Sequence, residues 1–350
     1  MDRFNVIGLM SGTSLDGLDI AHCTFEFDGG KWSFDIAQCE TLNYTENWRS
    51  ALSGAANLPE AELRELDDSY GRFLGEQVAR FTKQHAIHPD FISSHGHTVI
   101  HEPEKGITVQ IGRGGILSNT CGFPVVNDFR TENVQAGGQG APLVPVGDVL
   151  LFSEYSACLN LGGIANLSTV LNGRIHAYDI AICNLAFNYF ASLEGGDFDE
   201  KGNLGRSGQL DENVLFELNN LEYFKMSAPK SLDASFFKHK MLPILNLDNR
   251  SIADCARTCY EHLAFQLGSS LHGNGSVLVS GGGAYNTFLI ELLENTYKVD
   301  MVLAEKKLID FKEALIFAFL GVLRVRGEVN CLASVTGAPI DMSTGKTHGF

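Results

Sequence analysis

The stretch GLMSGTSLDGLD, residues 8–19, decides the predicted fold of this chain. The apolar run 4–10 leads into it, and a second apolar run, 20–27, follows it. Two strands are therefore predicted to meet in a hairpin whose turn covers residues 11–18. The turn is rich in small residues and carries aspartates, which suits the phosphates of a nucleotide.

The turn has the composition of an anion site. Gly12 and Gly17 permit positive φ and let backbone N–H groups approach an anion closely. The hydroxyl groups of Ser11, Thr13 and Ser14 add hydrogen-bond donors, so a polyphosphate could be held without a lysine. A phosphotransferase is the leading interpretation.

Asp16 is predicted to lie on the metal side of this turn. A carboxylate beside a phosphate suits Mg²⁺, which takes few protein ligands and keeps several waters. The alternative is an ordinary hairpin, because Gly, Ser and Asp are common in turns for local reasons.

Size and charge limit the remaining choices. The 350 residues exceed the usual size of one hydrophobic core, so two domains are expected. The net charge of −16 argues against nucleic acid or an anionic membrane as a partner and favours a small polar substrate. We find no signal segment and no apolar run of about 20 residues. The eight cysteines are scattered without a C-x-x-C pair, so reduced thiols and a cytoplasmic location are predicted.

Helices and strands are predicted to alternate, which indicates the α/β class. A helix is expected at 59–85 from the spacing of its apolar residues, with short strands at 91–94, 107–111 and 122–126.

A loop rich in Gly and Pro, residues 134–145, is the best candidate for the connection between domains. It leads into a helix-like stretch around Val149. We therefore expect domains of residues 1–130 and 131–350, with the crossover near 131–150.

The second half opens in the manner of the first. Strands at 157–161 and 164–170 flank Gly162 and Gly163, which gives a second hairpin with glycines at its tip. Two halves that open alike suggest a duplicated unit.

A third glycine turn follows the predicted strand 276–279. Gly281, Gly282 and Gly283 precede a helical segment, 286–295, and such a helix N-terminus is a ready site for nucleotide atoms. The last long helix is expected at 311–326.

These motifs, taken in order, resemble those of the anhydro-N-acetylmuramic acid kinases. The resemblance is carried by GLMSGTSLDGLD at 8–19, SHGHT at 94–98, HEP at 101–103, VQIG at 109–112, DFR at 128–130, AGGQGAPLVP at 136–145, LNLGGIANLS at 159–168, SGGGAYN at 280–286, FKEAL at 311–315 and SVTGA at 334–338. That family lies in the superfamily of acetate and sugar kinases, heat-shock chaperones and actin. The resemblance implies a two-domain, actin-like (ribonuclease H-like) ATPase fold with an interdomain cleft that closes on ligand.

The resemblance also implies a reaction. ATP and water open the 1,6-anhydro ring of 1,6-anhydro-N-acetylmuramic acid and phosphorylate O6, which gives N-acetylmuramic acid 6-phosphate and ADP during cell-wall sugar recycling. Because water must attack the anomeric carbon, a base is needed, and the matching residue is Asp179. ATP and Mg²⁺ are the implied cosubstrates, and a homodimer is a possible assembly.

Site residues follow from the matched motifs. The implied ATP-binding residues are Ser11, Gly12, Thr13, Ser14, Leu15, Asp16, Gly17, Leu18, Gly162, Gly163, Gly281, Gly282, Gly283 and Asn286, with Asp16 also the metal-side carboxylate. The implied substrate-binding residues are His97, Asp128, Arg130, Gly138, Gln139 and Asn184.

The chain departs from the family pattern beside the implied base. In DIAICN, Asp179 and Asn184 are kept, but Ile180, Ala181, Ile182 and Cys183 replace small and Gly-Pro-Gly residues. Branched residues would carry a conformational penalty if glycine were needed for close approach to phosphate. His97 and Asn133 also stand where many relatives have Gln and Asp. A non-catalytic nucleotide- or sugar-binding protein and a kinase for another sugar therefore remain as alternatives.

Several site residues have a second interpretation. Asp179 could be an aspartate in a turn after a strand. His95, His97 and His101 could bind zinc, although no accompanying residues have zinc spacing. Cys183 could be a nucleophile or a buried inert thiol, and Asp128 and Arg130 could form a structural pair.

Overall fold

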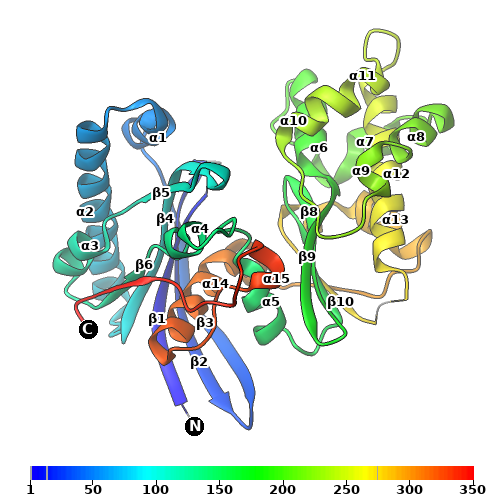
Figure 1. Cartoon of the computed structure of the whole chain (residues 1–350). Helices are drawn as coiled ribbons and strands as arrows, with labels where there is room; N and C mark the ends of the chain where they lie inside the picture. Colours follow the sequence, from blue (N-terminus) through cyan, green and yellow to red (C-terminus); the bar gives the residue numbers. More distant parts are fainter. Residues whose placement is uncertain (1, 13–14, 274) are drawn as a thin grey trace. The chain divides into compact units, whose positions relative to one another are not determined.

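The computed structural model describes residues 2–12, 15–273 and 275–350, and these divide into two compact units. Unit 1 comprises Met1–Leu151 and Phe311–Phe350, and unit 2 comprises Phe152–Asp310. Each unit has its own sheet and helices (Figure 1). The predicted Thr13 and Ser14 lie outside the described residues.

Unit 1 is built on a seven-stranded sheet in the order β12-β6-β4-β1-β2-β3, with β5 paired to β4. β1, β2 and β3 run antiparallel, whereas β4 is parallel to β1 and β6 is parallel to β4. The predicted N-terminal hairpin is confirmed. The strands are β1 (Asp2–Ser11), β2 (Gly17–Asp28), β3 (Lys31–Asn43), β4 (Phe91–Glu102), β5 (Ile107–Ile111), β6 (Val125–Asn127) and β12 (Lys346–His348).

The helices of unit 1 cover both faces of this sheet. Ile7 and Leu9 of β1 belong to the buried cluster that includes residues of α2. Gly8 faces the opposite way, where a Cβ atom would lie 2.0 Å from the carbonyl oxygen of Ala314 in α14. The helices are α1 (Glu46–Gly54), α2 (Glu60–His85), α3 (Gly114–Cys121), α4 (Thr131–Gln135), α5 (Val144–Leu151), α14 (Lys306–Arg326) and α15 (Ala333–Thr336).

Unit 2 has a five-stranded sheet in the order β11-β10-β7-β8-β9. β7, β8 and β9 are antiparallel, and β10 and β11 continue the sheet in parallel from β7. The strands are β7 (Ala157–Leu161), β8 (Ile164–Leu171), β9 (Arg174–Ile182), β10 (Val277–Ser280) and β11 (Met301–Leu303).

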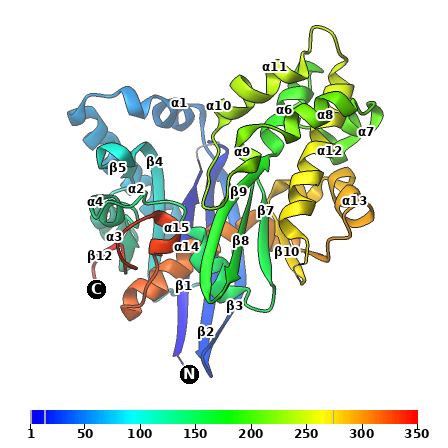
Figure 2. The ribbon, with the colours of Figure 1, turned by 45° about the vertical axis from the view of Figure 1, so that its right-hand side comes forward.

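Helices pack over the unit 2 sheet around one hydrophobic cluster that draws on α6, α12 and α13 (Figure 2). They are α6 (Asn184–Leu193), α7 (Asn203–Ser207), α8 (Glu212–Asn219), α9 (Glu222–Lys225), α10 (Ala234–Phe236), α11 (Leu242–Leu245), α12 (Ile252–Leu271) and α13 (Thr287–Asn295). No helix among the described residues is both long enough and apolar enough to cross a bilayer.

The two sheets share one topology. In each, three antiparallel strands are consecutive in the chain, and two parallel strands extend the sheet from the first of them. The α/β class and the duplicated unit are therefore confirmed, and this repeated order agrees with the expected ribonuclease H-like, actin-like fold. The expected interdomain cleft stays a prediction.

The division of the chain differs from the expected domains of 1–130 and 131–350. Unit 1 extends to Leu151, and the chain returns to it from Phe311 onward. The physical reason is that α14 packs on β1 while β12 pairs with β6. A return of this kind has no local signal in the sequence.

We predict that Gly8→Ala destabilises unit 1 by about 3 kcal/mol, because the new methyl group must displace the α14 backbone. Gly54→Ala is the matched control, since a Cβ atom at Gly54 meets nothing within 4 Å. Urea unfolding followed by circular dichroism measures both. Equal midpoints for the two variants would contradict the close packing of α14 on β1.

Candidate functional site

The β1–β2 turn is shaped by local contacts as well as by glycine. Ser11 pairs with Leu18 across the hairpin, and the N–H group of Leu15 donates to the carbonyl of Gly12 at 3.3 Å. Leu15 has a φ of 60°, which is uncommon for a branched residue. A Cβ atom at Gly17 would lie 2.5 Å from the Leu42 carbonyl oxygen, so glycine is required there by β3.

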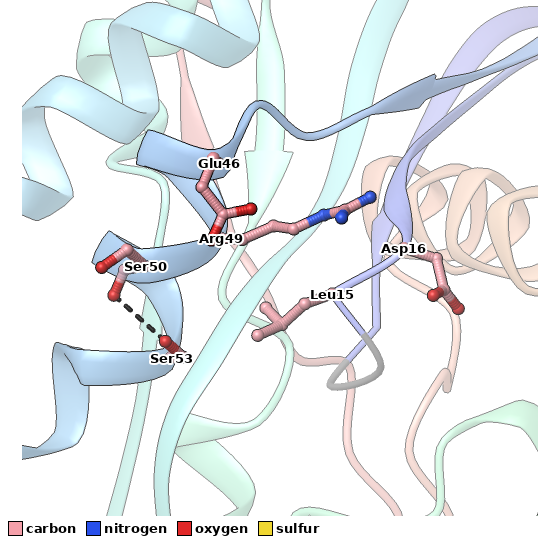
Figure 3. A pocket seen from close by; sticks show the side chains of 6 residues that line it. All are labelled: Leu15, Asp16, Glu46, Arg49, Ser50 and Ser53. Carbon is pink, nitrogen blue, oxygen red and sulfur yellow. Dashed lines mark hydrogen bonds between the residues drawn. The ribbon is translucent and has the colours of Figure 1, made fainter. Parts of the chain in front are cut away.

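A cavity of about 380 Å³ opens between this turn and α1 (Figure 3). Its wall contains Asp16 of the turn with Glu46 and Arg49 of α1, and the Arg49 guanidinium points toward the turn side of the cavity. The Asp16 carboxylate is an oxygen ligand of the kind that Mg²⁺ prefers, but it points away from Glu46 in Figure 3, so the two do not form one donor set. The metal expected beside Asp16 stays a prediction. The other lining residues are Leu15, Ser50 and Ser53.

The predicted substrate residue His97 is buried beside the turn. Its Nδ1 lies 2.9 Å from the Oγ of Ser11, which also accepts a hydrogen bond from Tyr44 at 2.8 Å. Burial lowers the pKa of His97. The pair brings a residue of the predicted sugar site against the first residue of the predicted phosphate turn.

Arg130 is held by His95 and by the glycine-rich loop. The guanidinium donates to Nε2 of His95 at 2.9 Å and to the carbonyl of Gly140 at 2.7 Å. Nδ1 of His95 lies 3.0 Å from the Gly96 carbonyl, so the ring is neutral with its proton on Nδ1. Burial, followed by the charge of Arg130, holds the pKa of His95 well below its usual range. Burial also lowers the pKa of Arg130 to about 10.

Asn133 fixes the loop that carries Gly138 and Gln139. Its Oδ1 accepts from the Gly140 N–H at 2.8 Å, and its Nδ2 donates to Oγ1 of Thr336 at 3.1 Å. A Cβ atom at Gly138 would lie 2.2 Å from the Asn133 Oδ1. Gln139 donates its backbone N–H to the Thr336 carbonyl at 2.7 Å, and its side chain is exposed. An amide is needed at Asn133 because the Thr336 hydroxyl already donates to Leu332.

Asp128 and Arg130 do not form the structural pair that was considered as an alternative. One Asp128 oxygen accepts from the hydroxyl of Thr131 at 2.6 Å, and the other pairs with Lys346 at 2.7 Å. Its backbone has a φ of 56°. Both carboxylate oxygens thus have local partners, and the predicted sugar contact of Asp128 stays a prediction.

At least one ring nitrogen of each of the three histidines considered for zinc has another partner. His101 bonds to Thr108, His95 to Arg130, and His97 to Ser11. Within the described residues, no three His, Cys, Asp or Glu side chains form a metal-ligand group.

The second-half hairpin turn is joined to the start of α6. The N–H groups of Cys183 and Asn184 donate to the carbonyls of Gly163 and Gly162 at 3.0 and 3.1 Å. The Asn184 side chain donates to the Leu161 carbonyl at 3.0 Å. The predicted Gly162, Gly163 and Asn184 are thus one hydrogen-bonded cluster.

The Gly281–Gly283 turn packs against the same cluster. Gly281 has a φ of +81°, and a Cβ atom on it would lie 2.5 Å from Oδ1 of Asn160. A Cβ atom on Gly283 would lie 2.7 Å from the Leu161 side chain, whereas Gly282 has ordinary clearance. Asn286 caps α13 by accepting from Leu289 and donates to the Tyr260 hydroxyl. Close packing therefore requires Gly281 and Gly283 even without a ligand.

Asp179 lies within β9, the edge strand of the unit 2 sheet, rather than in a turn after a strand. The segment before α10 lines this edge, because the Asp179 N–H donates to Lys230 and the Leu232 N–H donates to Oδ2 of Asp179 at 2.8 Å. Burial raises the pKa of Asp179, and the Leu232 bond opposes the shift. A positioned carboxylate of raised pKa is suited to accept a proton.

The DIAICN segment has no left-handed residue. Ile180, Ala181 and Ile182 are buried in β9, and Cys183 has φ −124°. Cys183 also has a ψ of −111°, which lies outside the helical and extended regions, and the effect of these residues on the approach of a phosphate stays a prediction. Burial raises the pKa of Cys183 to about 12, so its thiol stays protonated and the inert interpretation is favoured over the nucleophile.

Residues 4–348 match the family described as anhydro-N-acetylmuramic acid kinase. The chain belongs to this family. A protein of that name from Methylobacterium nodulans is 34% identical over 97% of this chain and 98% of its own. Another, from Methylorubrum extorquens, is 32% identical over 97% of each. Among solved structures, component A of (R)-2-hydroxyglutaryl-CoA dehydratase from Acidaminococcus fermentans is 12% identical with a TM-score of 0.44, covering 90% of this chain and 96% of that one.

The chain is thus a sugar kinase, and three charged residues near its predicted site were not anticipated. Glu46 and Arg49 of α1 line the cavity beside Asp16, and this helix was not predicted from the sequence. Glu313 of α14 lies within electrostatic range of Arg130 and Asp19. Desolvation raises the pKa of Glu313, while the charge of Arg130 opposes the rise. The sequence feature that could have identified Glu313 is the FKEAL motif.

We predict that Asn133→Asp in this kinase lowers the free energy of unfolding by about 2 kcal/mol, because a buried carboxylate cannot donate to Thr336. Asn249→Asp, at an exposed amide, is the control. Thermal and urea unfolding compare the two. An unchanged stability of Asn133→Asp would contradict the donor role of the amide.

Proposed function

We propose that the chain catalyses the ATP-dependent opening of the 1,6-anhydro ring of 1,6-anhydro-N-acetylmuramic acid and phosphorylates O6. The products are N-acetylmuramic acid 6-phosphate and ADP. The observation that carries the proposal is the positioned Asp179 carboxylate, whose pKa is raised by burial. A kinase acting on a sugar with a free hydroxyl has less need of a base that activates water. Membership of the family supports the same substrate.

The reaction needs two events at the sugar. Water attacks the anomeric carbon and loses a proton to Asp179, while the bond from that carbon to the bridging oxygen breaks. The bridging oxygen stays on C6 and takes the γ-phosphoryl group from ATP. The Leu232 N–H holds one oxygen of Asp179, so the other remains for the water.

The phosphate side is assigned to the β1–β2 turn. Ser11, Gly12 and the residues up to Leu18 would hold the phosphates mainly through backbone N–H groups. Asp16, which lines the cavity, would hold Mg²⁺ beside the phosphates. The metal, when bound, neutralises charge on the phosphates, because phosphoryl transfer depends on positioning and electrostatics. Gly162, Gly163, Gly281, Gly282, Gly283 and Asn286 are proposed to contact the rest of the nucleotide.

The sugar side is assigned to the residues around Arg130. The Arg130 guanidinium donates its hydrogen bonds to His95 and to the Gly140 carbonyl rather than to a carboxylate. Asn133 holds the backbone of Gly138 and Gln139 in place. His97 and Asn184 are the further sugar contacts that we propose.

The proposed reaction would serve the recycling of peptidoglycan sugars, and it would place the kinase in the cytoplasm where ATP is available. The departure at DIAICN motivates one rival, a non-catalytic binder of nucleotide or sugar. The intact Asp179 geometry favours catalysis over that rival.

The test is ADP release with ATP, Mg²⁺ and the anhydrosugar. We expect Asp179→Asn to lower kcat by at least about a hundredfold while it still binds the sugar, because the base contributes mainly to the chemical step. Asp233→Asn is the matched control, since that exposed carboxylate only caps α10. N-acetylmuramic acid, which has no anhydro ring, replaces the substrate in a parallel assay. Tight binding without ADP release by the unmodified chain would show that it is a binder.

We predict an acid limb in the pH profile that belongs to Asp179. A base acts when deprotonated, so kcat/KM falls as the pH falls through its pKa. Because burial raises the pKa of Asp179 above its usual 3.8, the limb lies at a higher pH than for an exposed aspartate. Initial rates across pH, with stability checked at each point, measure it. An activity that stays constant down to the pKa of a free aspartate would contradict the assignment.

A further inference from the structure

Four buried side chains form a continuous hydrogen-bond chain that ends at the phosphate turn. The Tyr70 and Tyr44 hydroxyls are 2.6 Å apart, Tyr44 donates to Oγ of Ser11 at 2.8 Å, and Ser11 lies 2.9 Å from Nδ1 of His97. The most exposed of the four is Tyr44 at 4%. The chain joins α2, the segment after β3, β1 and β4.

The direction of donation along this chain can be worked out from its buried end. The fully buried Tyr70 hydroxyl has Tyr44 and Ser11 as its partners, so its hydrogen goes to one of their oxygens or stays unpaired in the core. Tyr44 then uses its own hydrogen toward Ser11. Burial raises the pKa of both tyrosines, so both remain protonated donors.

At its other end, this hydrogen-bond chain determines which ring nitrogen of His97 carries the proton. Ser11 has one hydrogen, and the acceptor within reach is Nδ1 of His97. A neutral imidazole that accepts at Nδ1 carries its proton on Nε2. Within the described part of the chain, Nε2 of His97 has no hydrogen-bond partner. It is therefore available to a bound molecule.

We propose that Tyr70, Tyr44 and Ser11 form a one-way chain of donors that fixes the proton of neutral His97 on Nε2, which makes His97 a hydrogen-bond donor to an acceptor oxygen of the bound substrate. His97 would thus contact the substrate directly, with its tautomer set by a hydrogen-bond chain that begins outside the site at Tyr70. The role toward substrate rests on the proposed function, whereas the tautomer does not. A sugar oxygen and a phosphate oxygen are the two sources of such an acceptor.

The neighbours of His97 are consistent with a neutral ring. Tyr70 contacts it edge-on, with ring centroids 6.4 Å apart, and His95 lies two residues before it on β4. The Arg130 guanidinium is directed at His95.

The first experiment is ¹⁵N NMR of the histidine side chains in the whole protein, with His97 assigned by its loss in His97→Gln. We expect Nδ1 as the unprotonated acceptor and Nε2 as the protonated nitrogen. Tyr44→Phe removes one hydroxyl from the chain and should give a mixture of tautomers. A proton on Nδ1 in the unmodified protein, or an unchanged tautomer in Tyr44→Phe, would overturn the proposal.

The second experiment separates the two ligands. We expect His97→Ala to raise the KM for either the anhydrosugar or ATP by about tenfold, the equivalent of one hydrogen bond, with kcat changed by less than about twofold. His97→Gln should recover KM to within about threefold, because its amide can accept from Ser11 and donate to the ligand. His101→Gln is the control, on the same strand but bonded to Thr108. If the protein shows no turnover, the dissociation constants for ADP and for the sugar are compared between the variants instead of KM. Equal losses in His97→Ala and His97→Gln would contradict the donor role.

Discussion

The close approach of α14 to β1 at Gly8 is the constraint on which unit 1 depends. Without a Cβ atom at Gly8, the Ala314 carbonyl can lie against the strand, and the C-terminal part of the chain can close over one face of the sheet. Ser93 of the neighbouring strand reinforces the contact through its hydrogen bond to the Phe317 carbonyl. This packing fixes the end of β1, from which Ser11 enters the turn, and it places Glu313 in electrostatic range of Arg130.

Burial controls the chemistry of the charged groups more than ion pairing does. His95 is kept neutral by desolvation and accepts from Arg130, which retains its charge for a ligand. Desolvation also raises the pKa of Asp179, and the backbone N–H of Leu232 holds the orientation of its carboxylate. The buried pair of Lys312 and Asp148 lies 2.7 Å apart and ties α14 to α5. Removing either partner would leave an uncompensated buried charge.

Local patterns in the sequence were sufficient for much of the fold. The β1–β2 hairpin, α2, β5 and β7 follow from apolar spacing and glycine turns, and their observed bounds lie within a few residues of those predicted. β3 and β9 were missed. β3 begins with a clear alternation, in which polar residues separate Trp32, Phe34 and Ile36, and this available signal was not used. β9 contains the polar positions around Asp179, which interrupt its alternation. The return of residues 311–350 depends on pairing between distant segments, which no local pattern encodes.

The parts of the candidate site that carry a sequence motif could be predicted. The parts that depend on contacts between distant residues could not. The glycines at 162, 163, 281 and 283 were anticipated, but the close contacts of Gly281 and Gly283 with β7 and its end give a packing reason that the sequence alone did not show. In the sequence, Asn133 was noted only as a departure from the family pattern. Its structural role depends on a hydrogen bond to Thr336, some two hundred residues later. The tyrosine chain that reaches His97 had no signal at all, because its members come from four separate elements.

The fate of the water oxygen tests the central claim most directly. The reaction is run in H₂¹⁸O with ATP, Mg²⁺ and the anhydrosugar, and the products are separated by mass spectrometry. Attack by an Asp179-activated water at the anomeric carbon predicts one ¹⁸O in the sugar phosphate, at the anomeric position, and none in the transferred phosphoryl group. Label in inorganic phosphate, with ADP formed and the sugar unlabelled, would contradict ring opening coupled to phosphoryl transfer.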